Sequence, residues 1–280
     1  MYKKLIKSYQ TKLILLIFIS IAFDYFFLID LSQPPAWDQG YHLSNMFKMH
    51  NIISDNNTSF FNKYDSLLNI TNSYRGPLTY LISSLATQFT NNSYLGAFLS
   101  NHIFNILSIY SIFILGETLK DKRTGIWASI FFSFSYLIIN ARIDYLIDLS
   151  LTSFSISYIV LLMKWGEEKK SLSLLSFFCG LNYAFIFLIK PSGIVFFFAP
   201  ILYILIRKYK GTKNKFYFLI YFLLFLLTFI ISIYPWLSRH WLTIISSTIN
   251  AWEWGINYQD GLDSNTLDGW LFYIKKIPRA

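Results

Sequence analysis

An aspartate that follows two prolines is the first residue of this chain with a clear chemical use. Pro34 and Pro35 favour an extended backbone, which places Asp38 close to the end of the long apolar segment before them. This position holds an anionic side chain over the edge of the bilayer. Tyr41 follows three residues later. An ordinary solvated turn aspartate ahead of an interfacial helix is the alternative interpretation.

Cations at the ends of apolar segments are expected to bind phosphate at a membrane surface. Arg75 precedes a Gly-Pro turn, and Lys190 lies alone between two apolar segments. Arg239 and His240 follow the end of another such segment. Guanidinium and ammonium groups both bind phosphate oxygens. Arg75 is equally consistent with contact to any lipid phosphate, and Arg239 with His240 fits an anchor among interfacial aromatic residues.

Arg142, Asp144 and Asp148 form a further charged group between two apolar segments. The two aspartates are four residues apart and would share one face of a helix. Charged side chains at a membrane edge are costly unless they are paired or hydrated, so this group favours a water-filled cavity. The carboxylates can orient a substrate or hold a divalent cation, although two carboxylates alone do not establish a metal site. Ordinary ion pairing in an interfacial loop is the alternative.

Several familiar chemistries have no sequence motif here. The four histidines lack metal-ligand spacing, and neither a phosphate-binding loop nor a serine nucleophile elbow occurs. The single cysteine, Cys179, provides neither a disulfide nor a thiolate metal site. ATP hydrolysis and serine-hydrolase chemistry are therefore not expected, and a divalent cation is the only cofactor that the carboxylates would suit.

Long apolar segments must position these residues. Of the 280 residues, 54% are hydrophobic and 14% charged, whereas about a quarter of a soluble domain is charged. The sequence predicts an all-α bundle of about seven transmembrane helices, because a span needs roughly 20 apolar residues. The predicted spans are 13–31, 94–116, 124–140, 145–163, 172–189, 191–206 and 216–237.

The basic residues predict the orientation of the chain. Segments 1–12, 117–123, 164–171 and 207–215 hold fifteen of the 24 Lys and Arg, and basic short loops stay in the cytoplasm. The net charge of +9 thus indicates topology, and no nucleic-acid partner is expected. Segments 32–93 and 238–280 then lie on the outer face. Residues 77–89 are too short to cross and predict an interfacial or re-entrant helix.

Taken together, the motifs resemble GT-C glycosyltransferases that use lipid-linked sugars. The similar family, glycosyltransferase family 39, includes protein O-mannosyltransferases and bacterial aminoarabinose transferases. Trp37-Asp38-Gln39-Gly40-Tyr41 resembles the acidic motif that opens its first outer loop, and Arg75-Gly76-Pro77-Leu78-Thr79-Tyr80 resembles the segment that ends this loop. Arg142 with Asp148-Leu149-Ser150-Leu151, and Gly180 with Leu188-Ile189-Lys190, are similar to two later motifs.

The resemblance covers residues 13–241 and implies a function. A polyprenyl-phosphate donor would give its sugar, with inversion, to an unknown glycan, lipid or protein acceptor. The site would face the periplasm or the outside of a bacterial cytoplasmic membrane, with Asp38 as the general base. Membrane lipid would be the other partner. The substrate-binding residues would be Tyr41, Arg75, Arg142, Asp144, Asp148, Lys190, Arg239 and His240.

Two departures from the family pattern leave alternatives open. Gln39 stands where many relatives carry a second carboxylate, so Asp38 would act alone. The chain is also short for the family, and we expect it to lack the usual C-terminal part. A transporter or flippase of a lipid-linked intermediate and a truncated, non-catalytic membrane subunit are the two alternative functions.

Overall fold

Helices form all the regular secondary structure in the described part of the chain. The computed structural model describes residues 2–28, 37–71, 75–90, 93–167, 172–211 and 215–258. Within these ranges the all-α prediction is confirmed. The elements are α1 (Tyr2–Leu28), α2 (Trp37–Ser54), α3 (Phe60–Asn69), α4 (Leu78–Thr87), α5 (Ser93–Leu119), α6 (Lys122–Ser133), α7 (Tyr136–Ile143), α8 (Ile147–Glu167), α9 (Leu172–Ile189), the 3-10 helix η1 (Pro191–Ile194), α10 (Val195–Gly211) and α11 (Lys215–Tyr258).

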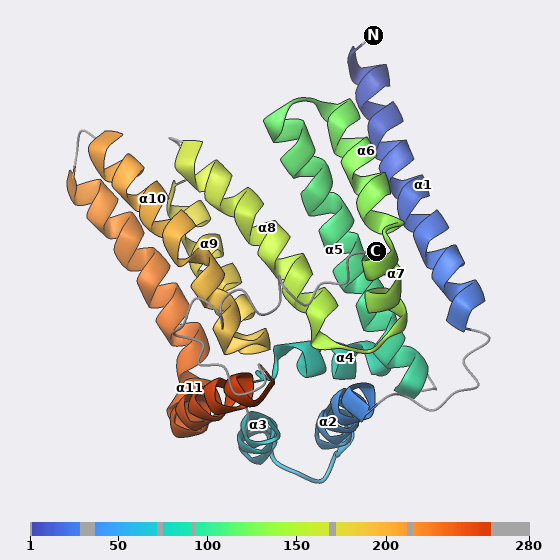
Figure 1. Ribbon diagram of the computed structural model, residues 1–280, viewed down its shortest axis with the longest axis vertical. Coiled ribbons are helices and arrows are strands. Elements are labelled where there is room, and N and C mark those ends of the chain that lie inside the picture. Colours follow the sequence, from blue (N-terminus) through green and yellow to red (C-terminus); the bar gives the residue numbers. More distant parts are fainter. Residues whose placement is uncertain are drawn as a thin grey trace.

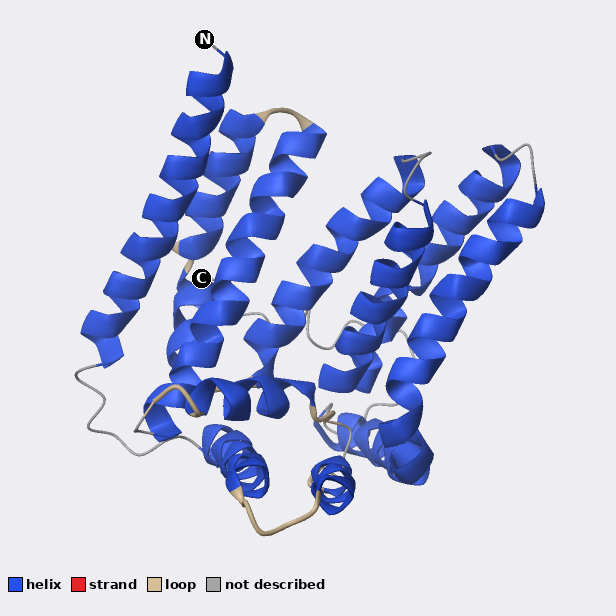
Figure 2. Cartoon of the chain, turned by 180° about the vertical axis from the view of Figure 1, so that it is seen from behind, coloured by secondary structure: helices blue, strands red, loops and turns tan. Residues whose placement is uncertain are grey.

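The long helices stand side by side, and the shorter helices α2, α3 and α4 lie across one end of them (Figure 1). The amino terminus, the turn between α5 and α6 and the end of α8 lie together at the opposite end (Figures 1 and 2). The end of α10 lies there as well. The predicted basic and polar segments are thus separated to the two ends of the bundle.

The described helices make this a multi-pass membrane protein. Five of them are long and apolar enough to cross a bilayer, and a sixth span results if α6 and α7 count as one. The sequence predicts seven, because it includes 172–189. That segment is α9, which is apolar over Ser173–Ile189 only and falls short of the other spans.

The predicted span 124–140 is not a straight helix. It consists of α6 and α7, which meet at an angle of 60°. The break lies at Phe134 and Ser135, where the backbone leaves the helical conformation. A break of this kind frees backbone carbonyl groups, which need hydrogen-bond donors where water is scarce.

Residues 77–89 form the short helix that the sequence predicts. This helix, α4, lies across the end of the bundle in Figure 1 rather than along it. Small hydroxyl side chains fix it: Thr79 Oγ1 lies 2.6 Å from Ser150 Oγ of α8, and Ser83 Oγ lies 2.7 Å from Ser100 Oγ of α5. Such side chains let helices approach closely and bond to one another.

The last described helix, α11, is much longer than the predicted span 216–237. It continues to Tyr258, has Pro235 within it, and turns at its lower end in Figure 1. Gly180 of α9 permits close packing against it, since a Cβ atom there would lie 2.4 Å from the Phe225 carbonyl oxygen. Residues 259–280 of the predicted outer segment lie outside the described residues.

Candidate active site

Two loops that are distant in sequence meet at the end of the bundle covered by α2 and α4. The Gly76 amide donates a hydrogen bond to the Ile189 carbonyl oxygen at 2.9 Å. The absence of a side chain makes this contact feasible, because a Cβ atom on Gly76 would lie 2.0 Å from the Leu188 carbonyl oxygen. Arg75 precedes the first partner and Lys190 follows the second. The contact therefore brings two predicted phosphate-binding cations into one region.

Asp38 and Tyr41 of α2 both contact Arg75. The Asp38 carboxylate lies 3.3 Å from the Arg75 guanidinium, and the guanidinium carbon lies 5.0 Å from the centre of the Tyr41 ring. Asp38 occupies the first turn of α2, where the helix dipole favours a negative charge. Its side chain is 64% exposed, against 17% for Arg75. The carboxylate is therefore accessible to a substrate, whereas the arginine is held in place beside it.

His42 belongs to this site, although its sequence position gave no metal or catalytic motif. Its Nδ1 atom lies 2.6 Å from the Tyr80 hydroxyl of α4, and the two rings stack. The pKa of His42 is lowered to about 4, mainly by burial; the charges of Arg75 and Lys190 act in the same direction, and the charge of Asp38 opposes them. The imidazole is therefore neutral near pH 7 and ties α2 to α4. Its position beside Tyr41 was the only signal in the sequence.

Asp144 also contacts α2. Gln39 donates a hydrogen bond from Nε2 to Asp144 Oδ1 at 3.2 Å. Burial raises the pKa of Asp144. The Asn101 side chain of α5 donates to the Asp144 carbonyl at 3.1 Å and to the Arg142 carbonyl at 3.0 Å. The residue next to Asp38 is therefore linked to the turn between α7 and α8.

The prediction that Asp144 and Asp148 share a helical face is wrong. Asp144 is the C-terminal cap of α7 and has an extended backbone, and α8 begins at Ile147. Asp148 lies in the first turn of α8 and is exposed. The break between the two helices, which spacing alone does not reveal, changes the relation between the two side chains.

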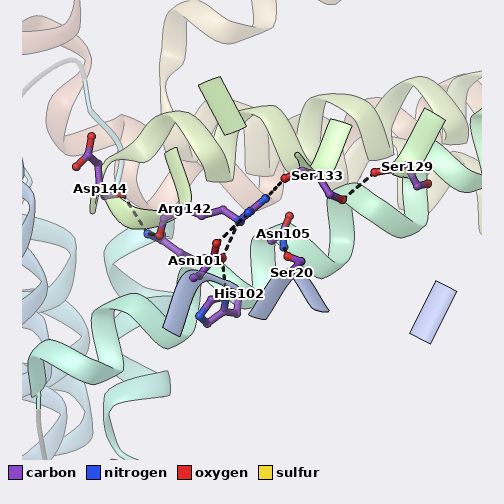
Figure 3. Close-up of polar contacts among 9 residues, drawn as sticks. Ser20, Asn101, His102, Asn105, Ser129, Ser133, Arg142 and Asp144 are labelled. Carbon is purple, nitrogen blue, oxygen red and sulfur yellow. Dashed lines mark hydrogen bonds and ion pairs between the residues drawn. The ribbon is translucent and has the colours of Figure 1, made fainter. Parts of the chain in front are cut away.

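Arg142 lies away from solvent, within the bundle. Its Nε atom lies 2.6 Å from Asp24 Oδ2 and its Nη2 atom 2.8 Å from Asp24 Oδ1. Its Nη1 atom donates to the Ser133 carbonyl oxygen, at the break between α6 and α7 (Figure 3). The structure thus brings this predicted substrate-binding residue to Asp24 of α1, which sequence reasoning did not single out.

Arg239 and His240 contact α3. Arg239 lies 2.6 Å from the Asp65 carboxylate, and His240 Nε2 lies 2.7 Å from the Leu68 carbonyl oxygen. Both residues follow the proline of α11, so the turned end of this helix is attached to α3. These two contacts hold α3 against α11 at the end of the bundle that carries Asp38.

Among the described residues, no group of three or more His, Cys, Asp or Glu side chains has the arrangement of a metal site. The arrangement consists of an accessible carboxylate beside one cation, Arg75, with a second cation, Lys190, close enough to affect the same histidine. Such a group can take a proton from a nucleophile and stabilise a phosphate that leaves.

The fold defines a multi-pass membrane protein with a group of charged and polar residues at one end of its helix bundle. Residues 74–237 match the family model of the dolichyl-phosphate-mannose-protein mannosyltransferases, which is more than half of the chain. The chain belongs to this family, a family of membrane glycosyltransferases, as its sequence motifs predict. No curated protein and no solved structure matches the chain.

The matched range divides the candidate site. It contains Arg75 and Lys190, together with the turn that holds Asp144. Asp38 and Tyr41 precede it, and Arg239 and His240 follow it. Asp38 is connected to the matched range through its contact with Arg75.

Proposed function

We propose that this protein transfers a sugar from a polyprenyl-phosphate donor to an acceptor hydroxyl, at the end of the bundle that carries α2, α3 and α4. The observation that carries the proposal is the hydrogen bond from Gly76 to Ile189, which joins the segment of Arg75, the partner of Asp38, to the segment of Lys190. The distribution of Lys and Arg supports an outer-face location for this end.

The two cations would bind the donor phosphate. A lipid-linked donor keeps its tail in the bilayer and its phosphate at headgroup depth, where the end of a helix bundle can reach it. Arg75 and Lys190 supply two positive charges, and Asp38 supplies one negative charge. Negative charge grows on the phosphate as its bond to the sugar breaks. Fixed cations at that position stabilise the transition state more than the ground state.

Asp38 would serve as the general base. The acceptor oxygen attacks the anomeric carbon, its proton passes to Asp38, and the bond from that carbon to the phosphate oxygen breaks with its electron pair on the phosphate. A single displacement of this kind inverts the anomeric configuration. The exposed Asp38 side chain suits an acceptor that arrives from the water phase.

The remaining residues would shape the acceptor side of the site. Asp144 and Asp148 lie at the turn that faces α2 and can accept hydrogen bonds from hydroxyl groups of a sugar or acceptor. Tyr41 offers an aromatic face beside Arg75. Arg239 and His240 hold α3 in place and so determine how close the acceptor can come.

The test uses the purified chain in nanodiscs with a panel of radiolabelled polyprenyl-phosphate sugars. The wild type is expected to release label from the lipid, and Asp38→Asn to lose this release while remaining folded. Asp55→Asn is the matched control, because Asp55 is another aspartate of the outer loop whose contacts are with Asn57 and Thr58 of its own turn. An Asp38→Asn variant with the wild-type rate would rule out the assignment of the base.

A lipid-linked-sugar transporter is the second candidate, because the bent pair α6 and α7 resembles the broken helices of transporters. The same nanodisc preparation separates the two functions. Movement of intact donor across the bilayer without release of label would favour transport, whereas release of label favours glycosyl transfer.

A further inference from the structure

Three ionisable side chains meet inside the bundle, apart from the candidate site. Asp24 of α1 and Arg142 at the end of α7 are both fully buried and form a two-pronged ion pair. His102 of α5 lies 3.6 Å from the same carboxylate, with its side chain 12% exposed. Charged residues in a membrane bundle are rare because burial is costly, and they commonly have a functional role. Arg142 and His102, which both contact the Asp24 carboxylate, extend from different helices in Figure 3.

The ion pair links α1, α6 and α7, three helices that also pack against one another. Arg142 binds the Asp24 carboxylate with two of its nitrogens and the Ser133 carbonyl with the third. The Ser133 carbonyl lies at the break between α6 and α7, where the helical hydrogen-bond pattern stops. The pair therefore holds the bend of this broken span and fastens its end to α1.

The same residue leads directly to the candidate site. Asp144 follows Arg142 by two residues, and a single Asn101 side chain binds the carbonyl groups of both. The Asp144 carboxylate in turn accepts the hydrogen bond from Gln39, the neighbour of Asp38. A continuous series of short polar contacts therefore runs from the interior of α1 to the first turn of α2.

We propose that Asp24 is a positioning residue: through Arg142 it fixes the end of α7, and so holds Asp144 against Gln39 at the catalytic end of the bundle. The proposal rests on the proposed function for its activity measurements. In this arrangement the Asp144 carboxylate lies beside the Gln39 amide, so the site holds a second carboxylate in addition to Asp38.

The first test is a set of variants assayed for sugar transfer in nanodiscs. Asp24→Asn is expected to lower kcat/KM about tenfold to a hundredfold, because small misplacements in an active site have effects of this size. Ser20→Ala is the matched control on the same helix, since Ser20 bonds Asn105 and not Arg142. If Asp24→Asn keeps the wild-type kcat/KM, the proposal is wrong.

A double-mutant cycle distinguishes positioning from a general loss of stability. In an Asp144→Ala background, Asp24→Asn is expected to cause little further loss of kcat/KM, because both changes remove the same contact. Independent, multiplied losses would contradict the proposal. Asp24→Asn/Arg142→Gln removes both charges, so no buried charge lacks a partner. If this double variant is fully active, or if it fails to fold as Asp24→Asn does, the ion pair serves folding alone and the proposal is wrong.

The second test needs no donor and so separates this proposal from the proposed function. Gln39→Cys and Asp144→Cys are introduced together, and their cross-linking is followed with a short thiol reagent; the native Cys179 is buried. Cross-linking is expected to fall severalfold when Asp24→Asn is added, and to stay unchanged with Ser20→Ala. Equal cross-linking with both changes would overturn the proposal even if the wild type transfers sugar.

Discussion

Gly76→Ala is the change that tests the geometry of the site most directly. The new Cβ atom would lie 2.0 Å from the Leu188 carbonyl oxygen and 2.3 Å from its carbonyl carbon. Both are backbone atoms, which cannot rotate away as a side chain can. The two loops must therefore separate by more than about 1 Å, and the hydrogen bond from Gly76 to Ile189 breaks, at a net cost of about 1 kcal/mol.

The effect on transfer should be much larger than the effect on stability. Separation moves the Arg75 segment away from the Lys190 segment, and so from the donor phosphate that we propose they bind; a misplacement of about 1 Å can slow a reaction about a hundredfold. Label release from the lipid-linked donor measures the rate, and thermal unfolding in detergent measures the fold.

Gly40→Ala is the control for this change. Nothing lies within 4 Å of a Cβ atom on Gly40, which is in α2 two residues after Asp38. Replacing a glycine within a helix by alanine stabilises it by up to about 1 kcal/mol, so this variant should keep the wild-type rate. A folded Gly76→Ala protein that transfers sugar as fast as Gly40→Ala would refute the link between this loop contact and catalysis.

Two further predictions concern stability. The pKa of His42 is lowered to about 4 in the folded protein, against an ordinary value of 6.5, so between these values the unfolded chain binds more protons and stability falls as the pH drops. Melting temperatures from pH 7 to 4 should show this fall in the wild type and a shallower one in His42→Gln; parallel curves would contradict it. Trp236→Ala should cost about 3–5 kcal/mol, because the ring is buried and donates to Thr71. Arg239→Leu should cost under about 1 kcal/mol, because its ion pair with Asp65 is largely exposed; equal shifts in the two melts would refute this ranking.

The sequence predicted which residues belong to the site better than it predicted the contacts between them. Lys190 stood out because a lone cation between apolar segments departs from the usual charge distribution, and it does lie in the turn between α9 and η1. Arg75 and Asp38 stood out separately. Their contact depends on how α2 returns to the bundle, and local sequence patterns do not contain that information.

The missed features have a common physical reason. Asp24 appeared as one charge inside a long apolar span, and only the fold reveals that Arg142 compensates for it. Spacing suggested one helix through Asp144 and Asp148, but the break that separates them is stabilised by contacts with Asn101, from another helix. Interactions between distant segments decided both cases, and periodicity reports only on neighbours along the chain.

The serine and threonine contacts around α4 have a consequence for how such a chain can diverge. A side chain that faces lipid needs only to be apolar, so exchanges among Phe, Ile and Leu on the outer surfaces of α1, α10 and α11 change little. Thr79, Ser83 and their partners Ser150 and Ser100 have no such freedom, because size and hydrogen bonding both matter there. The large aromatic and aliphatic residues make the chain suited to a membrane, and many substitutions preserve that property. The specific packing of the helices depends on a few small hydroxyl residues between them.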